Sequence, residues 1–216
     1  MKKSIYSLLI LGTRTFAVEV ADLATEIPRV RVAGFVENMS QQKCKGTLEG
    51  LPVFWVDDIQ KFAKSHWAVC ALGTTFRNRF TNQVASYGIR FMNLVHPSVR
   101  VSSRSTFGEG TIINGGVIIA SYTQIGCHVI VNRGALIGHH TKIGDYVTIG
   151  PGANIAASCT INNAAYIGMG AIIIDHVTIG AYSIVGAGAV VTKDVPDNVQ
   201  VVGVPAKIVK ENISGK

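Results

Sequence analysis

Polar residues that could carry chemistry gather in the second half of this 216-residue chain. An imidazole could carry a proton near neutral pH or bind a metal, and a carboxylate could assist in either task. A zinc site needs its ligands within a few ångström of one point, so the spacing of these residues decides what they can do. The residues are His128, Asn132, His139, His140, Asp145, Tyr146, Asp175 and His176.

A hexapeptide repeat positions these residues. From Val101 to Val191 every sixth residue is apolar, in sixteen of sixteen cases. The residue two places earlier is small or β-branched, and glycine often follows the aliphatic residue. This period is typical of a parallel β-helix, in which the aliphatic residues stack on the axis and three hexads form one triangular coil. We expect about five coils, with glycine at corners where a side chain would crowd or φ is positive.

The repeat argues against a metal site. His140 and His176 are 36 residues apart, which is two coils, or about 10 Å at the usual strand spacing. No third histidine follows at a suitable offset, although a neighbouring chain could add residues. We therefore expect no bound metal, and most charged residues of the repeat are expected to be solvated at corners.

The first half alternates extended and helical patterns. Strands are expected over residues 5–11, 31–36, 67–72 and 90–94, a short extended piece over 51–54, and helices over 18–24, 56–64 and 78–87. This order predicts a small Rossmann-like parallel α/β domain over residues 1–95, with the β-helix and its tail over 96–216. The start, Met1-Lys2-Lys3 before an apolar run, imitates a signal peptide, but the run is short and no cleavage site follows.

Ligands of parallel α/β sheets bind beyond the carboxyl ends of the strands. The sequence places there three short segments, which are Arg14-Thr15-Phe16, Glu37-Asn38 and Gly73-Thr74-Thr75. Only Gly12 remains of a glycine-rich phosphate turn. Arg14 could replace the missing backbone donors by its charge, or could be a solvated turn residue.

Composition restricts the partners and the compartment. The net charge of +7 is spread without a dense basic run, which favours small anionic ligands over nucleic acid. Four cysteines show no pairing or metal-ligand spacing, so we expect a reducing cytoplasm. No apolar run approaches the ~18 residues of a membrane helix, so no membrane insertion is expected.

Four segments carry a resemblance to a known family. They are Asn93-Leu94-Val95-His96-Pro97, the stretch from Asn132 to Asp145 around Gly138-His139-His140, the stretch from Val185 to Pro196, and Gly203-Val204-Pro205-Ala206-Lys207. The chain resembles bacterial left-handed β-helix acyltransferases, in particular those that acetylate nucleotide-linked amino sugars or sialic-acid-type sugars. The resemblance implies a left-handed coil, a homotrimer with sites between neighbouring prisms, acetyl-CoA as co-substrate, and a cytoplasmic role in surface-glycan biosynthesis.

The resemblance also implies roles for individual residues. His139 takes the place of the catalytic base, and His140 stands where the family commonly has an acid. Acetyl-CoA contacts map onto Thr148, Met169 and Ala187, with Thr148 replacing a frequent histidine. Sugar-nucleotide contacts map onto Arg14, Thr15, Phe16, Glu37, Asn38 and Gly73, of which the first three depart from the family's Gly/Ser-rich turn.

These inferences predict an enzyme that transfers acetyl from acetyl-CoA to an amine or hydroxyl of a sugar. His139 would take the acceptor proton while backbone N–H groups near a corner hold the oxyanion. Two alternatives stay open, which are an acyltransferase acting on an amino acid or free sugar, and a non-catalytic trimeric scaffold. In the second, His139 is an ordinary exposed corner residue. The sequence selects neither the sugar, the nucleotide, the acyl chain length nor the acylated atom.

Overall fold

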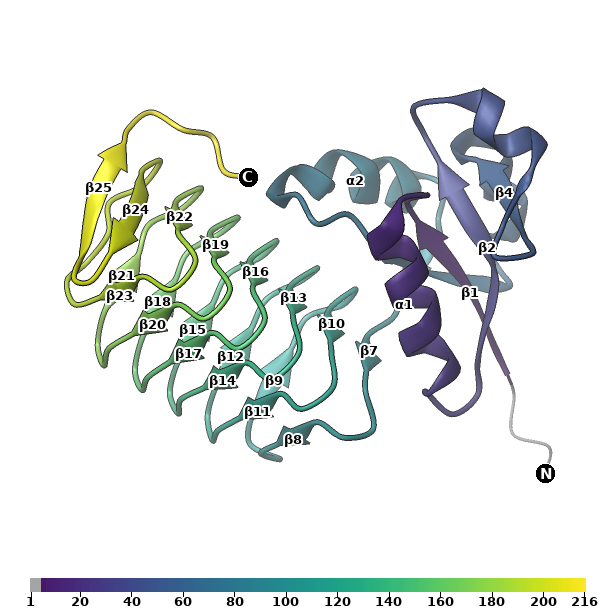
Figure 1. Ribbon diagram of the computed structural model, residues 1–216. Coiled ribbons are helices and arrows are strands. Elements are labelled where there is room, and N and C mark those ends of the chain that lie inside the picture. The colour runs from purple at the N-terminus through teal and green to yellow at the C-terminus, as the bar shows by residue number, and fades with distance from the viewer. Residues whose placement is uncertain (1–4) are drawn as a thin grey trace.

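The structure, a computed structural model, describes residues 5–216 and divides into a head and a triangular prism (Figure 1). The charged residues that begin the signal-like segment lie outside the described part. The head sheet has the strand order β3-β4-β2-β1-β5-β6, and its pairs are parallel except β3 with β4. Its strands are β1 (Tyr6–Leu11), β2 (Val30–Glu37), β3 (Thr47–Leu48), β4 (Leu51–Trp55), β5 (His66–Cys70) and β6 (Arg90–Phe91).

Helices cover both faces of the head sheet. They are α1 (Thr15–Thr25), α2 (Asn78–Ser86) and the 3₁₀ helices η1 (Gln41–Lys45), η2 (Val56–Phe62) and η3 (Thr75–Arg77). Alternate residues of β1 serve the two faces: Leu8 and Ile10 pack with α1, whereas Leu9 and Leu11 pack with η2 and α2. A strand buried on both faces is typical of a parallel sheet, and it explains the continuous apolar run at the start of the chain.

Two expected elements of the head differ in the structure. The helix expected over residues 56–64 is the shorter 3₁₀ helix η2. The strand expected over residues 90–94 splits, because β6 ends at Phe91 and the next strand, β7 (Leu94–Val95), already belongs to the prism. Between them the side-chain oxygen of Asn93 accepts a hydrogen bond from the N–H of Thr111, 2.9 Å away, which ties the connection to the prism.

Three parallel sheets form the prism, and each coil takes 18 residues, as the pairing of Ile112 with Ile130 shows. The head-facing sheet contains β7, β10 (Ile112–Ile113), β13 (Ile130–Val131), β16 (Thr148–Ile149), β19 (Tyr166–Ile167), β22 (Ile184–Val185), β24 (Gln200–Gly203) and the antiparallel β25 (Ala206–Lys210). The apolar sheet contains β8 (Arg100–Val101), β11 (Ile118–Ile119), β14 (Leu136–Ile137), β17 (Asn154–Ile155), β20 (Ile172–Ile173) and β23 (Val190–Val191). The polar sheet contains β9 (Thr106–Phe107), β12 (Gln124–Ile125), β15 (Lys142–Ile143), β18 (Thr160–Ile161) and β21 (Thr178–Ile179).

The prism core confirms the repeat. Every-sixth residues such as Ile137, Ile155 and Ile173 are buried in one continuous cluster. Where glycine follows such a residue, as Gly150 follows Ile149, close approach requires it, since a Cβ on Gly150 would lie 2.6 Å from the backbone nitrogen of Met169. Positive φ occurs at a different corner position, which returns every six residues from Gly110 to Gly188.

The occupants of this positive-φ position distinguish the edges of the prism. On the glycine edge, between the head-facing and apolar sheets, all five are glycine: Gly116, Gly134, Gly152, Gly170 and Gly188. On the histidine edge, between the apolar and polar sheets, they are Tyr122, His140, Ser158 and His176. The third edge, between the polar and head-facing sheets, carries Gly110, His128, Tyr146, Ala164 and Tyr182.

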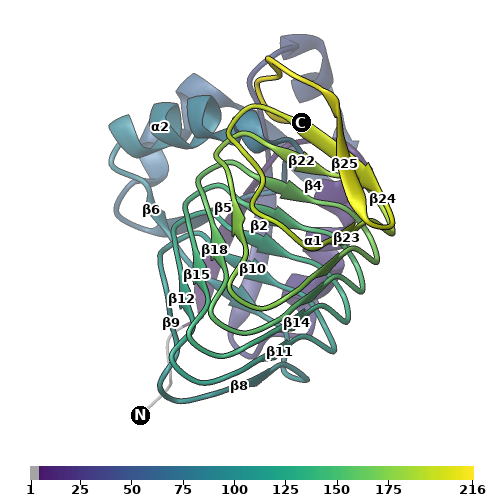
Figure 2. The same cartoon turned by 90° about the vertical axis from the view of Figure 1, so that its left-hand side faces the viewer.

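The head lies against the first strands of the head-facing sheet (Figure 1), and Figure 2 looks along the coils with the head behind them. Ile112 and Ile130 of that sheet belong to the same buried cluster as Leu8 and Ile10 of the head. At the far end the chain turns back after β25, and its last residue, Lys216, accepts a hydrogen bond from the N–H of Thr75 at 2.8 Å. The histidine edge is the one edge that does not border the head-facing sheet, so it lies opposite the head.

Candidate functional site

The adjacent histidines His139 and His140 lie on the histidine edge, between β14 and β15, and both are exposed. Their Nδ1 atoms are 3.0 Å apart, and their rings are nearly perpendicular, at 89°. A hydrogen bond between two imidazole nitrogens requires one to donate and the other to accept. When His139 donates through Nδ1, its Nε2 keeps a free lone pair that can accept a proton.

The ring of His140 is held from its other side. Tyr122, one coil earlier on the same edge, packs against it with ring centroids 4.9 Å apart and planes tilted by 31°. Arg104 in turn lies over the Tyr122 ring, 5.4 Å from its centroid. Tyr122 and His140 have φ values of 61° and 58°, a conformation that costs an L-residue about 1–2 kcal/mol and that glycine adopts on the glycine edge. The presence of Tyr122 and His140 at positions that favour glycine is consistent with a functional role for their side chains.

His140 occupies the place of the acid without a carboxylate nearby. Among residues 5–216 no carboxylate lies within ion-pair distance of His139 or His140. Asp175, two coils further along the edge, instead accepts a hydrogen bond from the N–H of Ala157 at 2.8 Å. Asp145 does the same for Cys127 at 2.7 Å, so these carboxylates cap backbone groups between coils.

Met169 and Ala187, predicted to contact acetyl-CoA, are exposed on the glycine edge. A Cβ added to Gly152, Gly170 or Gly188 would meet no atom within 4 Å, so the backbone along this edge is not covered by side chains. A long thin chain such as pantetheine can lie close to such a backbone and reach its N–H and C=O groups. The glycine edge therefore fits the co-substrate that the sequence predicts.

Thr148, the third predicted acetyl-CoA contact, has a different environment. It is 4% exposed, and its hydroxyl accepts a hydrogen bond from Arg77 at 2.9 Å. Arg77 is itself buried and also donates to the backbone oxygens of Thr74, His128 and Val147 at 2.7–2.9 Å. Within one chain Thr148 thus has no surface to offer a ligand and helps to fasten the head to the prism.

His128, another of the chemistry-bearing residues, is buried at the same junction. Its ring stacks on Tyr146 and meets Phe91 edge-on, and its Nδ1 has no hydrogen-bond partner among the described residues. Burial first, and then the charge of Arg77, lower the pKa of His128 to about 4. The ring is therefore neutral at physiological pH and packs as an aromatic residue.

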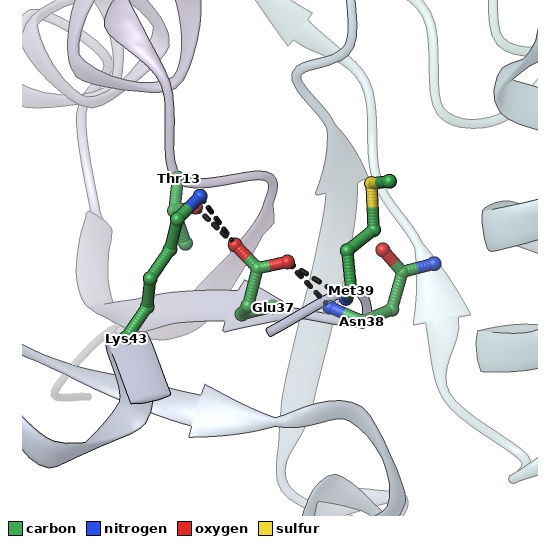
Figure 3. A network of polar contacts seen from close by, with 5 residues as sticks. All are labelled: Thr13, Glu37, Asn38, Met39 and Lys43. Atoms are coloured by element: carbon green, nitrogen blue, oxygen red, sulfur yellow. Dashed lines mark hydrogen bonds and ion pairs between the residues drawn. The ribbon is translucent and has the colours of Figure 1, made fainter. Parts of the chain in front are cut away.

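A pocket of about 290 Å³ lies beyond the carboxyl ends of β1 and β2. Glu37 is its buried wall: one carboxylate oxygen accepts from the N–H groups of Asn38 and Met39, at 3.1 and 2.8 Å, and the other from Thr13 and Lys43 (Figure 3). Burial acts to raise the pKa of Glu37, but these hydrogen bonds and the charge of Lys43 outweigh it and lower the pKa to about 2. The carboxylate is therefore ionised and held in place.

The structure brings together some of the predicted sugar-nucleotide contacts. Arg14, Glu37 and Asn38 line the pocket, as do Thr13 and Lys43, which the sequence did not single out. Phe16 is half-buried and packs against the α1-side core, while Thr15 and Gly73 are exposed outside the pocket lining. The sequence signal that could have identified Lys43 is its position in a polar loop, six residues after Glu37.

One chain does not unite the three predicted groups. The head pocket lies on the side of the head-facing sheet, Met169 and Ala187 lie on the glycine edge, and the histidine pair lies on the opposite edge. The apolar sheet separates the glycine edge from the histidine edge.

Within the described residues no group of three or more His, Cys, Asp or Glu side chains is placed to hold a metal ion. None of the helices in residues 5–216 is long and apolar enough to cross a membrane.

Comparison with known proteins gives a consistent result. The family described as bacterial transferase hexapeptide (six repeats) matches residues 122–157 and 158–193. A variant of perosamine N-acetyltransferase from Caulobacter crescentus, solved with CoA and GDP-perosamine, is 31% identical, with a TM-score of 0.87 over 96% of this chain and 99% of that one. No curated protein matches in sequence.

Two further solved structures extend the likeness. The acetyltransferase domain of PglB from Neisseria gonorrhoeae, in complex with acetyl coenzyme A, is 27% identical, with a TM-score of 0.87 over 95% of this chain and 100% of that one. WeeI from Acinetobacter baumannii is 29% identical, with a TM-score of 0.86 over 96% and 100%. The expected fold, an α/β head followed by a left-handed parallel β-helix, is confirmed.

Proposed function

The chain belongs to the hexapeptide-repeat acyltransferases that acetylate sugars with acetyl-CoA, and we propose that its acceptor is the amine of a nucleotide-linked amino sugar. The observation that carries this proposal is the likeness along the whole chain, head included, to an enzyme solved with CoA and GDP-perosamine. The head pocket, where Arg14, Lys43 and the ionised Glu37 offer hydrogen-bond donors and an acceptor, suits the polar groups of a nucleoside. We assign acceptor recognition to residues 1–95 and acetyl transfer to residues 96–216.

The histidine pair supplies the base. His139 donates its Nδ1–H to Nδ1 of His140, which leaves Nε2 free to accept a proton from the acceptor amine as the nitrogen attacks the thioester carbonyl. The new C–N bond forms, the C–S bond breaks, and the leaving thiolate takes the proton from Nε2 of His139 to become the thiol of coenzyme A. His140 accepts a hydrogen bond from the His139 imidazolium, a weaker support than the carboxylate that the family commonly has.

The donor is proposed to lie along the glycine edge, where Met169 and Ala187 are exposed beside the bare backbone of Gly152, Gly170 and Gly188. Backbone N–H groups of a prism corner are then available to the developing oxyanion. No metal is needed for this chemistry, because the thioester is already activated and the chain supplies the base.

A homotrimer would complete the site. Two outward residues of the apolar sheet, Leu136 and Ile172, are aliphatic and 40% and 44% exposed, with Asn154 between them, whereas the corresponding residues of the polar sheet include Gln124, Lys142 and Thr160. Exposed aliphatic residues in register along a sheet favour a protein–protein interface. A cyclic trimer that packs on Leu136 and Ile172 of this sheet would place the histidine edge of one copy near the glycine edge of the next. Free thiols at all four cysteines are consistent with a cytoplasmic enzyme.

The experiment that tests the proposed function is a thiol-release assay with acetyl-CoA. The acceptors are GDP-perosamine, other nucleotide-linked amino sugars, free amino sugars and amino acids. Thiol release with nucleotide-linked amino sugars alone supports the proposal. Release with free sugars or amino acids assigns a different acceptor, and no release with any acceptor contradicts an acetyltransferase.

A further inference from the structure

The lower end of the histidine edge, toward the first coil, carries side chains that no part of the proposed reaction uses. At 18-residue intervals the two corner positions of this edge hold Ser103 and Arg104, then Ser121 and Tyr122, then His139 and His140. Hydroxyl groups therefore follow one another directly below the base, and a guanidinium and a phenol lie below its partner. The N–H of His140 donates to the backbone oxygen of Ser121 at 3.0 Å, which fixes this register.

A hollow of about 540 Å³ opens beside these residues on the apolar-sheet side, and we call it the serine hollow. Its polar lining consists of Arg100, Ser102, Ser103 and Ser121, and Ile118 forms part of its apolar wall. The Ser102 hydroxyl donates to the Ser121 hydroxyl at 3.3 Å and accepts from the N–H of Arg104 at 3.3 Å. Within the described residues the side chain of Ser103 makes no hydrogen bond, so it is available to a ligand.

Two cations at the hollow lack a counter-charge. The guanidinium of Arg100 lines it, and that of Arg104 lies at the adjoining corner over Tyr122. Both residues are exposed, and in the described chain neither makes an ion pair or a side-chain hydrogen bond. No carboxylate is among the residues that line the hollow. Guanidinium groups with hydroxyl neighbours are well suited to phosphate oxygens, which they contact through parallel N–H donors.

We propose that the serine hollow binds the diphosphate of the acceptor, with Arg100 and Arg104 on its charge and Ser103 and Ser121 on its oxygens. This inference rests on the proposed function and names a place on the prism for the part of the substrate next to the reacting sugar. Ser121 is one coil, about 4.8 Å, from the level of His139, so a diphosphate here keeps the attached sugar beside the base. The first turn of the head has Arg14 where a phosphate turn would have glycine. In this proposal the head of one copy therefore holds the nucleoside, while the serine hollow of a neighbouring copy holds the diphosphate of the same substrate.

The test compares the full-length wild type with Arg100→Met, Arg104→Met, the double variant and Ser121→Ala. The acceptor is a nucleotide-linked amino sugar that the wild type acetylates. For this acceptor, the KM of the double variant is expected to be on the order of 10-fold higher or more than that of the wild type, the usual effect of losing charge-assisted hydrogen bonds. The KM for acetyl-CoA should stay within about twofold, because the predicted contacts Met169 and Ala187 lie more than two coils further along the prism than the hollow. Arg79→Met, an exposed arginine on α2, is the matched control and should change neither KM.

A second measurement keeps the inference separate from the proposed function. Binding of inorganic pyrophosphate and of GDP is measured by calorimetry, which needs no turnover, and light scattering checks that each variant keeps the wild-type oligomeric state. Pyrophosphate binding by the wild type that weakens about 10-fold in the double variant, but not in Arg79→Met, supports the hollow even if no amino sugar is acetylated. Absence of pyrophosphate binding by the wild type, equal binding by the double variant, or an equal rise in the acetyl-CoA KM overturns it.

Discussion

Nδ1 of His139 lies 3.0 Å from Nδ1 of His140, and in the described chain no carboxylate lies beside either ring. A neutral imidazole can orient its neighbour by accepting one hydrogen bond, but it brings no negative charge to stabilise the imidazolium that forms during proton transfer. In the proposed mechanism the pair is therefore a weaker orienting device than a histidine beside a carboxylate.

The stacking of Tyr122 on His140 gives the first prediction. Tyr122→Ala removes the ring that holds His140 and should lower kcat by about 3- to 10-fold, with the acetyl-CoA KM unchanged, because the base is less well oriented. Tyr122→Phe keeps the ring and should retain most of the activity. A pH profile of kcat that is the same in Tyr122→Ala and in the wild type, together with an unchanged kcat, would show that the stack has no part in positioning.

The hydrogen bonds of Arg77 give the second prediction, which concerns how strongly they hold the head on the prism. Arg77→Met leaves the buried oxygens of His128 and Val147 without their donor and should lower the free energy of unfolding by roughly 2–4 kcal/mol in urea denaturation. Arg77→Lys keeps the charge but not the forked donor geometry, and should recover only part of the loss. Full stability in Arg77→Met would mean that these contacts contribute little.

The pKa of Glu37 predicts a pH dependence of stability. The folded-state pKa of about 2 lies below the ordinary value of 4.5, so the unfolded chain binds the proton more readily. The contribution of Glu37 is fully present above pH 4.5 and is lost as the pH falls toward 2, with a size on the order of 2 kcal/mol. Denaturation of wild type and Glu37→Gln at pH 3 and pH 6 isolates it, since their difference in stability should shrink at the lower pH. A difference that is the same at both pH values would contradict this assignment.

The apolar sheet predicts the assembly. Leu136→Arg places a charge among the exposed aliphatic residues of the apolar sheet and should convert the proposed trimer to monomers, as measured by light scattering, with loss of acetyl transfer. Gln124→Arg adds the same side chain on the polar sheet and should leave the trimer intact. Monomeric wild-type protein that is fully active at nanomolar concentration would remove the need for a shared site.

The sequence predicts the prism almost completely, because a fixed period of six residues specifies each inward position by itself. The sequence predicts one strand over residues 90–94 where the structure has two, since nothing local shows that Asn93 bonds to Thr111 on the next coil. The burial of Thr148 escaped prediction for a similar reason, because Arg77, its partner, is 71 residues away in the chain. The Glu37 pocket was predicted from topology, but Thr13 and Lys43 were found only through the side-chain directions of the folded head.

The central claim is that His139 is the base and His140 its support, and a comparison of kcat among variants at this pair tests it most directly. His139→Ala should lower kcat by about 10² to 10⁴ with little change in coenzyme A affinity, and His140→Ala should cost far less. His140→Asp should keep or raise activity, because it restores a carboxylate and because aspartate tolerates the φ of 58° found there. If the two alanine variants reverse their order, His140 is the base; if both have equal, small effects, the pair is only two solvated corner residues and the proposed mechanism is wrong.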